Sequence, residues 1–196
     1  TLKTPDDVNR YLGLPVLGMI DQYSDDKSER LITASSPRSP ISESFRALRT
    51  NVQYASVDVP LRSVLVTSSG PVEGKSTVAA NLAIVMAQSG RPTYLMDCDF
   101  RRPTMHTYFG LHNRSGLSSL LYQSNYKLNG SFKYERVRNL NVITTGSLPP
   151  NPAELLASTR MADLFAQVKA QANMVVVDSP PILAVTDAAI IAPTVD

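Results

Sequence analysis

The chain has 196 residues, of which 43% are hydrophobic and 18% charged, with 19 lysines and arginines against 17 aspartates and glutamates. These fractions are typical of one globular domain with an apolar core, and they exclude collagen-like, coiled-coil and wholly disordered chains. The net charge of +2 is too small to indicate a nucleic-acid partner. The single cysteine, Cys98, excludes an internal disulfide framework and a multi-cysteine zinc site, which favours a reducing compartment. The longest apolar run, Leu82–Ala87, is far shorter than the ~18 residues of a membrane span.

The N-terminal part of the chain is predicted to hold two helices, one strand and a linker. Thr4 as N-cap and Gly13 beyond the end indicate a short helix between them. The apolar run 15–20 predicts a strand, and the polar, serine-rich stretch 21–40 predicts a loop or linker. A second helix is predicted over 39–55, with apolar side chains along one face.

From residue 63 onward, short apolar strands alternate with helices. The predicted strands are 63–67, 92–96, 140–144 and 174–177, and the predicted helices are 75–89, one within 152–171, and one at about 184–192. Continuous apolar strands separated by helices imply a mostly parallel sheet that is covered by helices on both faces. The predicted fold class is therefore α/β.

A glycine-bearing loop joins the first of these strands to its helix. Its predicted nucleotide-binding residues are Gly70, Pro71, Val72, Glu73, Gly74, Lys75, Ser76 and Thr77. Backbone N–H groups at a helix N-terminus bind phosphates, Lys75 neutralises the β- and γ-phosphates, and the Ser76 hydroxyl can ligate Mg²⁺. Ser69 stands where the usual pattern has its first glycine. The alternative is an ordinary turn with an exposed lysine, but the strand–loop–helix context favours a nucleotide site.

Two further predicted strands end in carboxylates. Asp97 and Asp99 follow the second strand and project to the same side, with Arg101 close by, and Asp178 ends the strand at 174–177. Ligands of parallel sheets bind at the carboxyl ends of the strands, and carboxylates there suit Mg²⁺ and proton transfer. Asp97 and Asp99 could instead cap the following segment, and a strand that ends in aspartate, as at Asp178, is common by itself, so the prediction rests on the three elements together.

The combined motifs resemble those of the bacterial tyrosine kinases, the P-loop autokinases of capsular and exopolysaccharide export. The resemblance is carried by the loop ending Glu73-Gly74-Lys75-Ser76-Thr77, by Asp97-x-Asp99-x-Arg101-Arg102-Pro103, by Asp178-Ser179-Pro180-Pro181, and by the stretches 12–20 and 146–156. It spans almost the whole chain. It implies a P-loop NTPase fold of the type found in the partition ATPases.

This resemblance also implies roles for the site residues, with ATP and Mg²⁺ as cofactors. The implied catalytic residues are Lys75, Asp97, Asp99 and Arg101, and the implied metal ligands are Ser76, Asp99 and Asp178. Asp97 would lie near the incoming tyrosine as the base, and Arg101 would be available to a phosphate.

A helical motif resembles the family's oligomerisation element. Glu43, Arg46 and Arg49 lie on broadly one helix face, and the resemblance implies that they join subunits into a ring. The alternative is a surface salt bridge between Glu43 and Arg46 within one chain. Further implied partners are a membrane chain-length-determinant domain, fused or separate, and the tyrosine-rich tail of a neighbouring subunit. No nucleic-acid partner is expected, and the implied location is the cytoplasmic face of the bacterial membrane.

The expected organisation is an N-terminal junction and linker over 1–38, followed by a P-loop kinase domain over 39–196. The resemblance implies a final strand and a cluster of tail tyrosines beyond this domain, whereas the eight tyrosines here are scattered. Because the chain lacks an initiator methionine and stops after an apolar helical stretch, we expect a piece of a longer protein.

Two other functions remain open from the sequence. One is a nucleotide-switched partition-type ATPase, and the other is a non-catalytic nucleotide-binding regulator of a membrane partner. Partition ATPases usually carry a lysine where this chain has Gly70, which favours the kinase. His106 and His112 lack partner cysteines and are not expected to bind metal, and the acidic neighbours of Cys98 are expected to raise its pKa.

Overall fold

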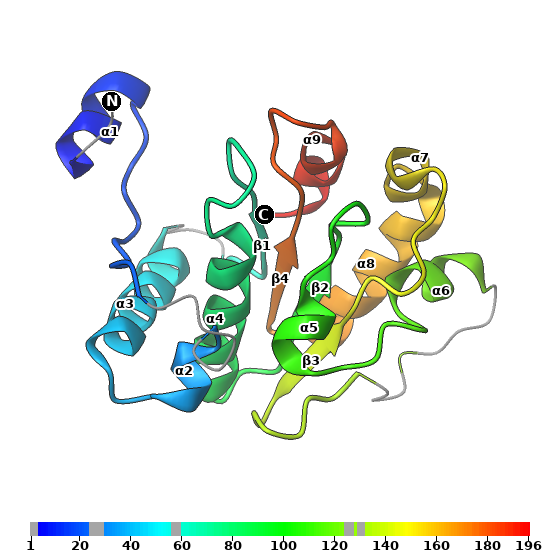
Figure 1. The fold of residues 1–196 in the computed structure, drawn as a ribbon, viewed down its shortest axis with the longest axis horizontal. Coiled ribbons are helices and arrows are strands. Elements are labelled where there is room, and N and C mark those ends of the chain that lie inside the picture. The colour runs from blue at the N-terminus through cyan, green and yellow to red at the C-terminus, as the bar shows by residue number, and fades with distance from the viewer. Residues whose placement is uncertain (1–3, 24–29, 56–59, 124–127, 129–131) are drawn as a thin grey trace.

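The computed structural model describes residues 4–23, 30–55, 60–123, 128 and 132–196. In this part of the chain, a sheet of four parallel strands stands at the centre, in the order β1-β4-β2-β3 (Figure 1). The strands are β1 (Ser63–Val66), β2 (Thr93–Asp97), β3 (Leu140–Ile143) and β4 (Met174–Asp178). The predicted parallel α/β architecture is confirmed. The register pairs Asp178 with both Val66 and Asp97, so three strands end level with one another.

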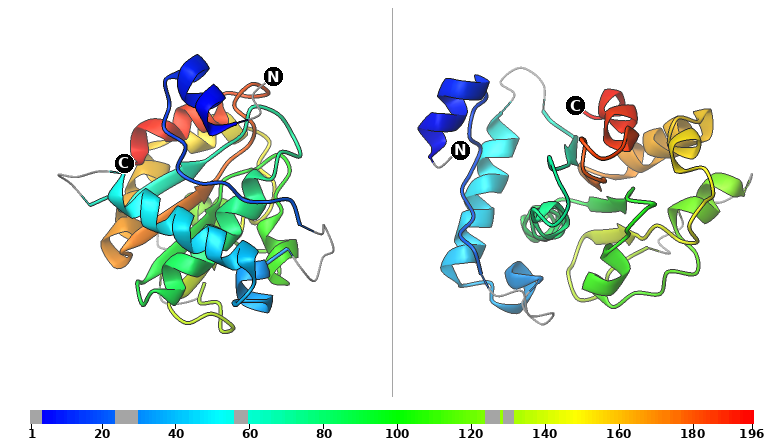
Figure 2. Two further views of the ribbon diagram at one scale, coloured as in Figure 1. Left: turned by 90° about the vertical axis from the view of Figure 1, so that its left-hand side faces the viewer. Right: turned by 45° about the horizontal axis from the view of Figure 1, so that its top comes forward.

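Helices cover both faces of the sheet, as the right-hand view of Figure 2 shows. The helices are α1 (Pro5–Leu12), α2 (Ile32–Ser35), α3 (Pro40–Tyr54), α4 (Lys75–Gln88), α5 (Met105–Phe109), α6 (Leu117–Tyr122), α7 (Pro152–Leu156), α8 (Thr159–Gln171) and α9 (Asp187–Ile191), with a 3₁₀ turn at Ala192–Thr194. Along β4, Met174 and Val176 face a core shared with α4, whereas Val175 and Val177 face a core shared with α8. This alternation gives each face of the sheet its own apolar layer.

Helix α4 directly follows the glycine-bearing loop that ends at Gly74 and is buried over most of its length. Residues 79–87 are all buried because α4 lies between the sheet and α3 (Figure 2). Met86 and Met96, from α4 and β2, are both fully buried in the core. A helix that is apolar nearly all round needs this inner position.

The predicted strand at 15–20 is not present. Residues 14–19 are exposed and run beside α3, where the Asn51 side-chain amide donates to the carbonyl of Leu17 at 2.7 Å (Figure 2). The segment meets a helix and not a sheet edge, so its backbone has no ladder partner. Helix α1, which the caps at Thr4 and Gly13 correctly predicted, stands away from the sheet with no buried residue (Figure 1).

The predicted linker at 21–40 contains the short helix α2. Ile32 and Thr33 are buried, and Asn81 of α4 accepts hydrogen bonds from the N–H and hydroxyl of Thr33 at 3.0 and 2.8 Å. The linker prediction was therefore wrong for this part, because a buried amide on α4 holds it in place. The junction and linker expected over 1–38 also include residues 1–3 and 24–29, which lie outside the described residues.

Two helix boundaries also differ from the prediction. The region 152–171 is divided into α7 and α8, because Ser158 caps α8 by accepting the N–H of Met161. The last helix begins at Asp187, because residues 182–184 form a turn after β4. No helix in the described residues is long and apolar enough to cross a membrane.

Candidate active site

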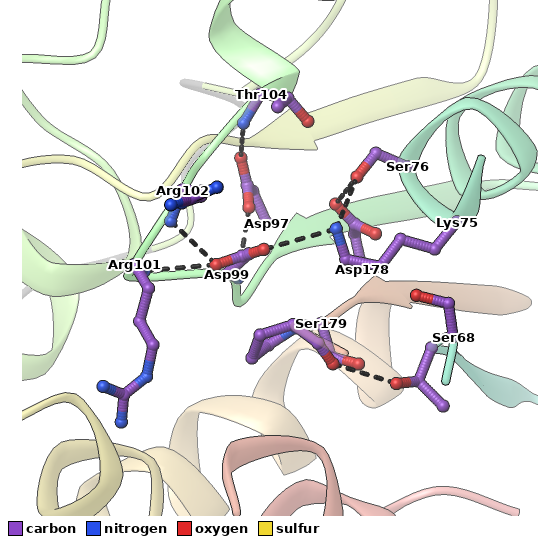
Figure 3. A network of polar contacts seen from close by, with 12 residues as sticks. Ser68, Lys75, Ser76, Asp97, Asp99, Arg101, Arg102, Thr104, Asp178 and Ser179 are labelled. Carbon is purple, nitrogen blue, oxygen red and sulfur yellow. Dashed lines mark hydrogen bonds and ion pairs between the residues drawn. The ribbon is translucent and has the colours of Figure 1, made fainter. Parts of the chain in front are cut away.

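The carboxyl ends of β1, β2 and β4 surround one pocket. It has a volume of about 970 Å³ and is lined by the loop 71–77, by Asp99, Arg101 and Arg102, and by Pro180 and Pro181. These residues come from three loops that are far apart in the sequence and lie at one edge of the sheet (Figures 1 and 3). The pocket thus lies where parallel α/β sheets bind their ligands.

The loop 69–74, called the phosphate loop here, is shaped by two residues with left-handed backbone conformation and by an acidic side chain. Gly74 has φ 88°, which suits a glycine, and Val72 has φ 63° at the exposed tip of the loop. The Glu73 carboxylate accepts the N–H of Gly70 at 3.0 Å and the hydroxyl of Ser69 at 2.9 Å. These hydrogen bonds, first that from Gly70, lower the pKa of Glu73. Ser69, which replaces the usual glycine, therefore helps to brace the loop.

The first two residues of α4 meet carboxylates from two other strands (Figure 3). Lys75 Nζ lies 3.4 Å from Asp99 Oδ2 and 3.4 Å from the Ser76 hydroxyl oxygen. Ser76 donates to Asp178 Oδ2 at 2.7 Å. The predicted residues Lys75, Ser76, Asp99 and Asp178 are therefore brought together at the start of α4.

Asp178 has the chemistry of a metal ligand. Burial, and then the charge of Asp97, raise its pKa to about 8. Its second oxygen, Oδ1, is buried with no hydrogen-bond partner in the structure. A buried carboxylate oxygen without a donor beside a serine hydroxyl fits Mg²⁺, which uses one or two carboxylates together with phosphates and waters. No cluster of three or more His, Cys, Asp or Glu side chains arranged for metal binding occurs in the described residues.

Asp97 lies behind this group and does not line the pocket. It is fully buried, and its Oδ2 accepts the N–H groups of Thr104 and Met105 at 3.2 and 3.1 Å. Its Oδ1 accepts the N–H of Asp99 at 3.2 Å. Burial raises the pKa of Asp97 to about 6, although these hydrogen bonds act in the opposite direction. In this conformation Asp97 shapes the turn that carries Asp99.

Arg101 is held by a residue that sequence reasoning missed. Its Nε and one terminal nitrogen both donate to the carboxylate of Asp187 at 2.9 Å. No motif marks Asp187, which lies 86 residues further along the chain. Arg101 lines the pocket as expected, but its fork points at α9 and not at the phosphate loop.

Tyr108 is a second residue of the pocket that no motif indicated. Its hydroxyl is 3.3 Å from that of Thr77, and the Arg30 guanidinium lies 5.1 Å from its ring centroid. These contacts depend on how α5 packs against α4, which local sequence does not reveal. Cys98 is buried and its pKa is raised well above the ordinary value, first by burial and then by Asp97, as its acidic neighbours predicted.

The charged motif on α3, made of Glu43, Arg46 and Arg49, does not line the pocket, although Phe45 of the same helix does. Arg46 forms a salt bridge with Glu43 in the same helix, which confirms that the pair exists within one chain. Arg49 is half-buried and donates to the carbonyl of Val85 at 3.1 Å. Glu43 is the exposed member of the three.

The sequence and the fold are similar to those of known ATPases and tyrosine-protein kinases. The sequence profile of the family described as ATPase MipZ matches residues 62–190, which contain all four strands described above. The tyrosine-protein kinase YwqD of Bacillus subtilis is 46% identical over 166 residues, which are 85% of this chain and 70% of YwqD. The kinase domain of the Escherichia coli tyrosine kinase ETK matches with a TM-score of 0.89 and 30% identity, over 100% of this chain and 80% of that one.

A more distant structure shows the same fold. The septum site-determining protein MinD of Pyrococcus horikoshii, complexed with Mg-ADP, matches with a TM-score of 0.55 and 18% identity, over 68% of this chain and 54% of that one. This likeness concerns the fold alone, and it agrees with the partition-ATPase type expected from the sequence. Taken with its close relatives, the chain belongs to the family of bacterial tyrosine-protein kinases, built on the MipZ-type P-loop ATPase fold.

Proposed function

We propose that this chain is an ATP- and Mg²⁺-dependent protein-tyrosine kinase domain that regulates polysaccharide polymerisation or export. The observation that carries the proposal is the meeting of Lys75 and Ser76 with Asp99 and Asp178 beside one pocket. Phosphoryl transfer needs little covalent chemistry from the protein, and depends on positioning and on charge stabilisation. Membership in the tyrosine-kinase family supports the choice of acceptor.

The residues of the pocket suit the transfer of the γ-phosphoryl group of ATP to a phenol oxygen. In this step the phenol oxygen bonds to the γ-phosphorus, the bond to the β–γ bridging oxygen breaks, and ADP leaves. The N–H groups of the loop 70–77 would bind the phosphates, with Lys75 neutralising the charge that develops. Ser76 and Asp178 would hold Mg²⁺, with Asp99 on the pocket side. When bound, Mg²⁺ supplies positive charge to the β- and γ-phosphate oxygens.

The phenol proton requires an acceptor among the carboxylates. Asp97 is the base that the family resemblance implies, and a pKa of about 6 makes it more basic than an ordinary aspartate while leaving it ionised near neutral pH. Asp99 is nearer to the pocket in this conformation. Comparing Asp97→Asn with Asp99→Asn assigns the role: the base is the residue whose loss lowers kcat and leaves the affinity for Mg·ADP unchanged.

The acceptor and the partners are part of the same proposal. The acceptor would be a tyrosine-rich tail of a neighbouring subunit, and the partner would be a membrane chain-length-determinant domain at the cytoplasmic face of the membrane. The ring would be joined through Glu43, Arg46 and Arg49 of α3. Both arginines also contact their own chain, Arg46 at Glu43 and at the carbonyl of Pro37, and Arg49 at the carbonyl of Val85, so the test uses Arg46→Ala at a temperature where the variant is shown to be folded. Light scattering should show the assembly lost in Arg46→Ala and kept in Arg136→Ala, and an unchanged assembly in both contradicts the ring role.

The kinase proposal is tested with γ-labelled ATP, Mg²⁺ and a tyrosine-rich peptide. We expect label on the peptide with the wild-type chain and with Lys133→Met, a matched change at a lysine outside the pocket, and none with Lys75→Met. Released phosphate with an unlabelled peptide would favour a partition-type ATPase, a candidate supported by the ATPase MipZ profile. Nucleotide binding without turnover would favour a non-catalytic regulator.

A further inference from the structure

The first residue of α9 carries a buried carboxylate that the mechanism above does not use. The Asp187 side chain is 0% exposed, and both of its oxygens accept hydrogen bonds from Arg101 at 2.9 Å. This bidentate contact fixes the plane of the guanidinium as well as its position. A buried aspartate is costly unless it is paired, so Arg101 is the partner on which Asp187 depends.

Arg101 also belongs to the turn that presents Asp99. The backbone N–H groups of Arg101 and Arg102 donate to Asp99 Oδ1 at 3.2 and 2.9 Å. The other oxygen of Asp99, Oδ2, is then the one that lies 3.4 Å from Lys75 Nζ. The backbone of Arg101 thus orients Asp99, and its side chain anchors the same turn to α9.

The direction of the Arg101 side chain is the second observation. Figure 3 shows it extending away from Lys75 and Asp178, although it begins only two residues after Asp99. Asp187 raises the pKa of Arg101 most, and Asp99 and Glu154 add to this through their charges. Without Asp187, the guanidinium would be free to turn to Asp99, the carboxylate nearest to it in sequence. It would then compete with Lys75 for that carboxylate.

We propose that Asp187 is a positioning residue for phosphoryl transfer, which acts through Arg101 to hold the turn 99–102 and to leave Asp99 to Lys75. The residue does not line the pocket, although Ala184 and Val185 before it do, so its effect is indirect. The inference rests on the proposed kinase function for its readout. In this proposal Arg101 has a structural role at the pocket, in addition to the role toward phosphate that its motif implies.

The experiment compares wild type, Asp187→Asn, Arg101→Gln, the double variant and Asp163→Asn, an exposed aspartate on α8 that serves as the matched control. Three quantities are measured on each: kcat and KM for labelling of the tyrosine peptide, the Kd for Mg·ADP, and the Tm. We expect Asp187→Asn to lower kcat by about tenfold or more while the Kd for Mg·ADP changes by less than about threefold. The double variant should be no slower than the slower single variant, because both changes remove one contact.

The outcomes separate positioning from plain structural support. Equal kcat in Asp187→Asn and wild type overturns the proposal, as does a loss of kcat and of nucleotide affinity in equal proportion. If Asp187→Asn unfolds at the assay temperature, Asp187→Glu decides, since it keeps the charge and displaces the carboxylate from the Arg101 guanidinium. A lowered kcat with unchanged Kd in that variant supports the proposal, and an unchanged kcat overturns it. If wild type labels no peptide, the kinase function fails, and the same comparison is made on the rate of ATP hydrolysis.

Discussion

Three aspartates and one lysine lie close together at the carboxyl ends of the strands. Asp97, Asp99 and Asp178 lie at neighbouring strand ends, and Lys75 is the cation that contacts this group among the described residues. Burial and mutual repulsion raise the pKa of Asp97 to about 6 and that of Asp178 to about 8. This arrangement is unfavourable by itself, and the proposed Mg²⁺ ion would offset the repulsion between the carboxylates.

The pH dependence of stability follows from these two pKa values. Both lie above the ordinary 3.8, so the folded chain keeps protons that the unfolded chain has already released. The stabilisation is full below about pH 4 and is lost as the pH rises through about 6 and about 8. We expect the free energy of unfolding, measured with urea in metal-free buffer, to fall by on the order of a few kcal/mol between about pH 5 and pH 9.

The variant Asp178→Asn tests whether Asp178 causes the fall in the free energy of unfolding above about pH 7. In Asp178→Asn the fall above about pH 7 should disappear while the fall below it remains, since Asp97 still titrates. Asp163→Asn should leave the whole profile unchanged. A slope above about pH 7 that persists in Asp178→Asn contradicts the assignment.

Sequence motifs were informative for residues whose chemistry is local. Lys75, Ser76, Asp99 and Asp178 follow from a loop or from a strand end, and the structure brings all four together. Asp187 and Tyr108 could not be predicted in this way, because their contacts with Arg101 and Thr77 arise only when distant elements pack. The same limit applies to Asp97, whose burial behind Asp99 depends on how the turn folds over it.

The hydrophobic pattern correctly predicted the helices and strands that form the core. It failed for segments whose structure depends on a contact with a distant part of the chain. The four strands and α4 were predicted because buried apolar runs have few alternatives. The run 15–20 has the composition of a strand and lies against α3 instead, because no sheet edge is beside it. Helix α2 is joined to α4 by the hydrogen bonds between Thr33 and Asn81, and no pattern within the predicted linker indicates that contact.

The entry into α6 gives a sharp prediction on stability. A Cβ on Gly116 would lie 2.1 Å from the carbonyl oxygen of Thr144 and 2.5 Å from the nitrogen of Gly146, both of them backbone atoms. We expect Gly116→Ala to lower the free energy of unfolding by about 3 kcal/mol or more in urea titrations, because rigid backbone must move.

Gly90→Ala is the control for this change. Gly90 has φ 88°, and a Cβ added there would meet open space, so the cost of the substitution is backbone strain alone, about 1 kcal/mol. If Gly116→Ala costs no more than Gly90→Ala, Gly116 does not lie against the backbone of Thr144 and Gly146.

In the whole molecule, one apolar layer packs on each face of the sheet. The loops that follow β1, β2 and β4 lie together at the carboxyl ends of the strands. The layer with α4 supplies Lys75 and Ser76, and the layer with α9 supplies Asp187, while the turn after β2 supplies Asp99 and β4 supplies Asp178. A nucleotide bound at this edge, as proposed, would contact elements from across the fold. Binding should therefore stabilise the molecule as a unit.

We expect Mg·ADP at about a hundred times its Kd to stabilise the fold by about 2.7 kcal/mol, which corresponds to a rise in Tm of about 5 to 10 °C. Scanning calorimetry with and without EDTA measures this. The rise should be largely lost in EDTA and absent in Lys75→Met. A rise of equal size in EDTA would mean that Ser76 and Asp178 do not hold a metal ion.

We propose that the residues at the carboxyl ends of the strands transfer a phosphoryl group from ATP to tyrosine. The most direct measurement follows ADP and phosphotyrosine in the same reaction, with Mg·ATP and a tyrosine-rich peptide in excess. We expect about one phosphotyrosine for each ADP in wild type, and neither product above background in Lys75→Met. Steady formation of ADP and free phosphate with no phosphotyrosine would contradict it.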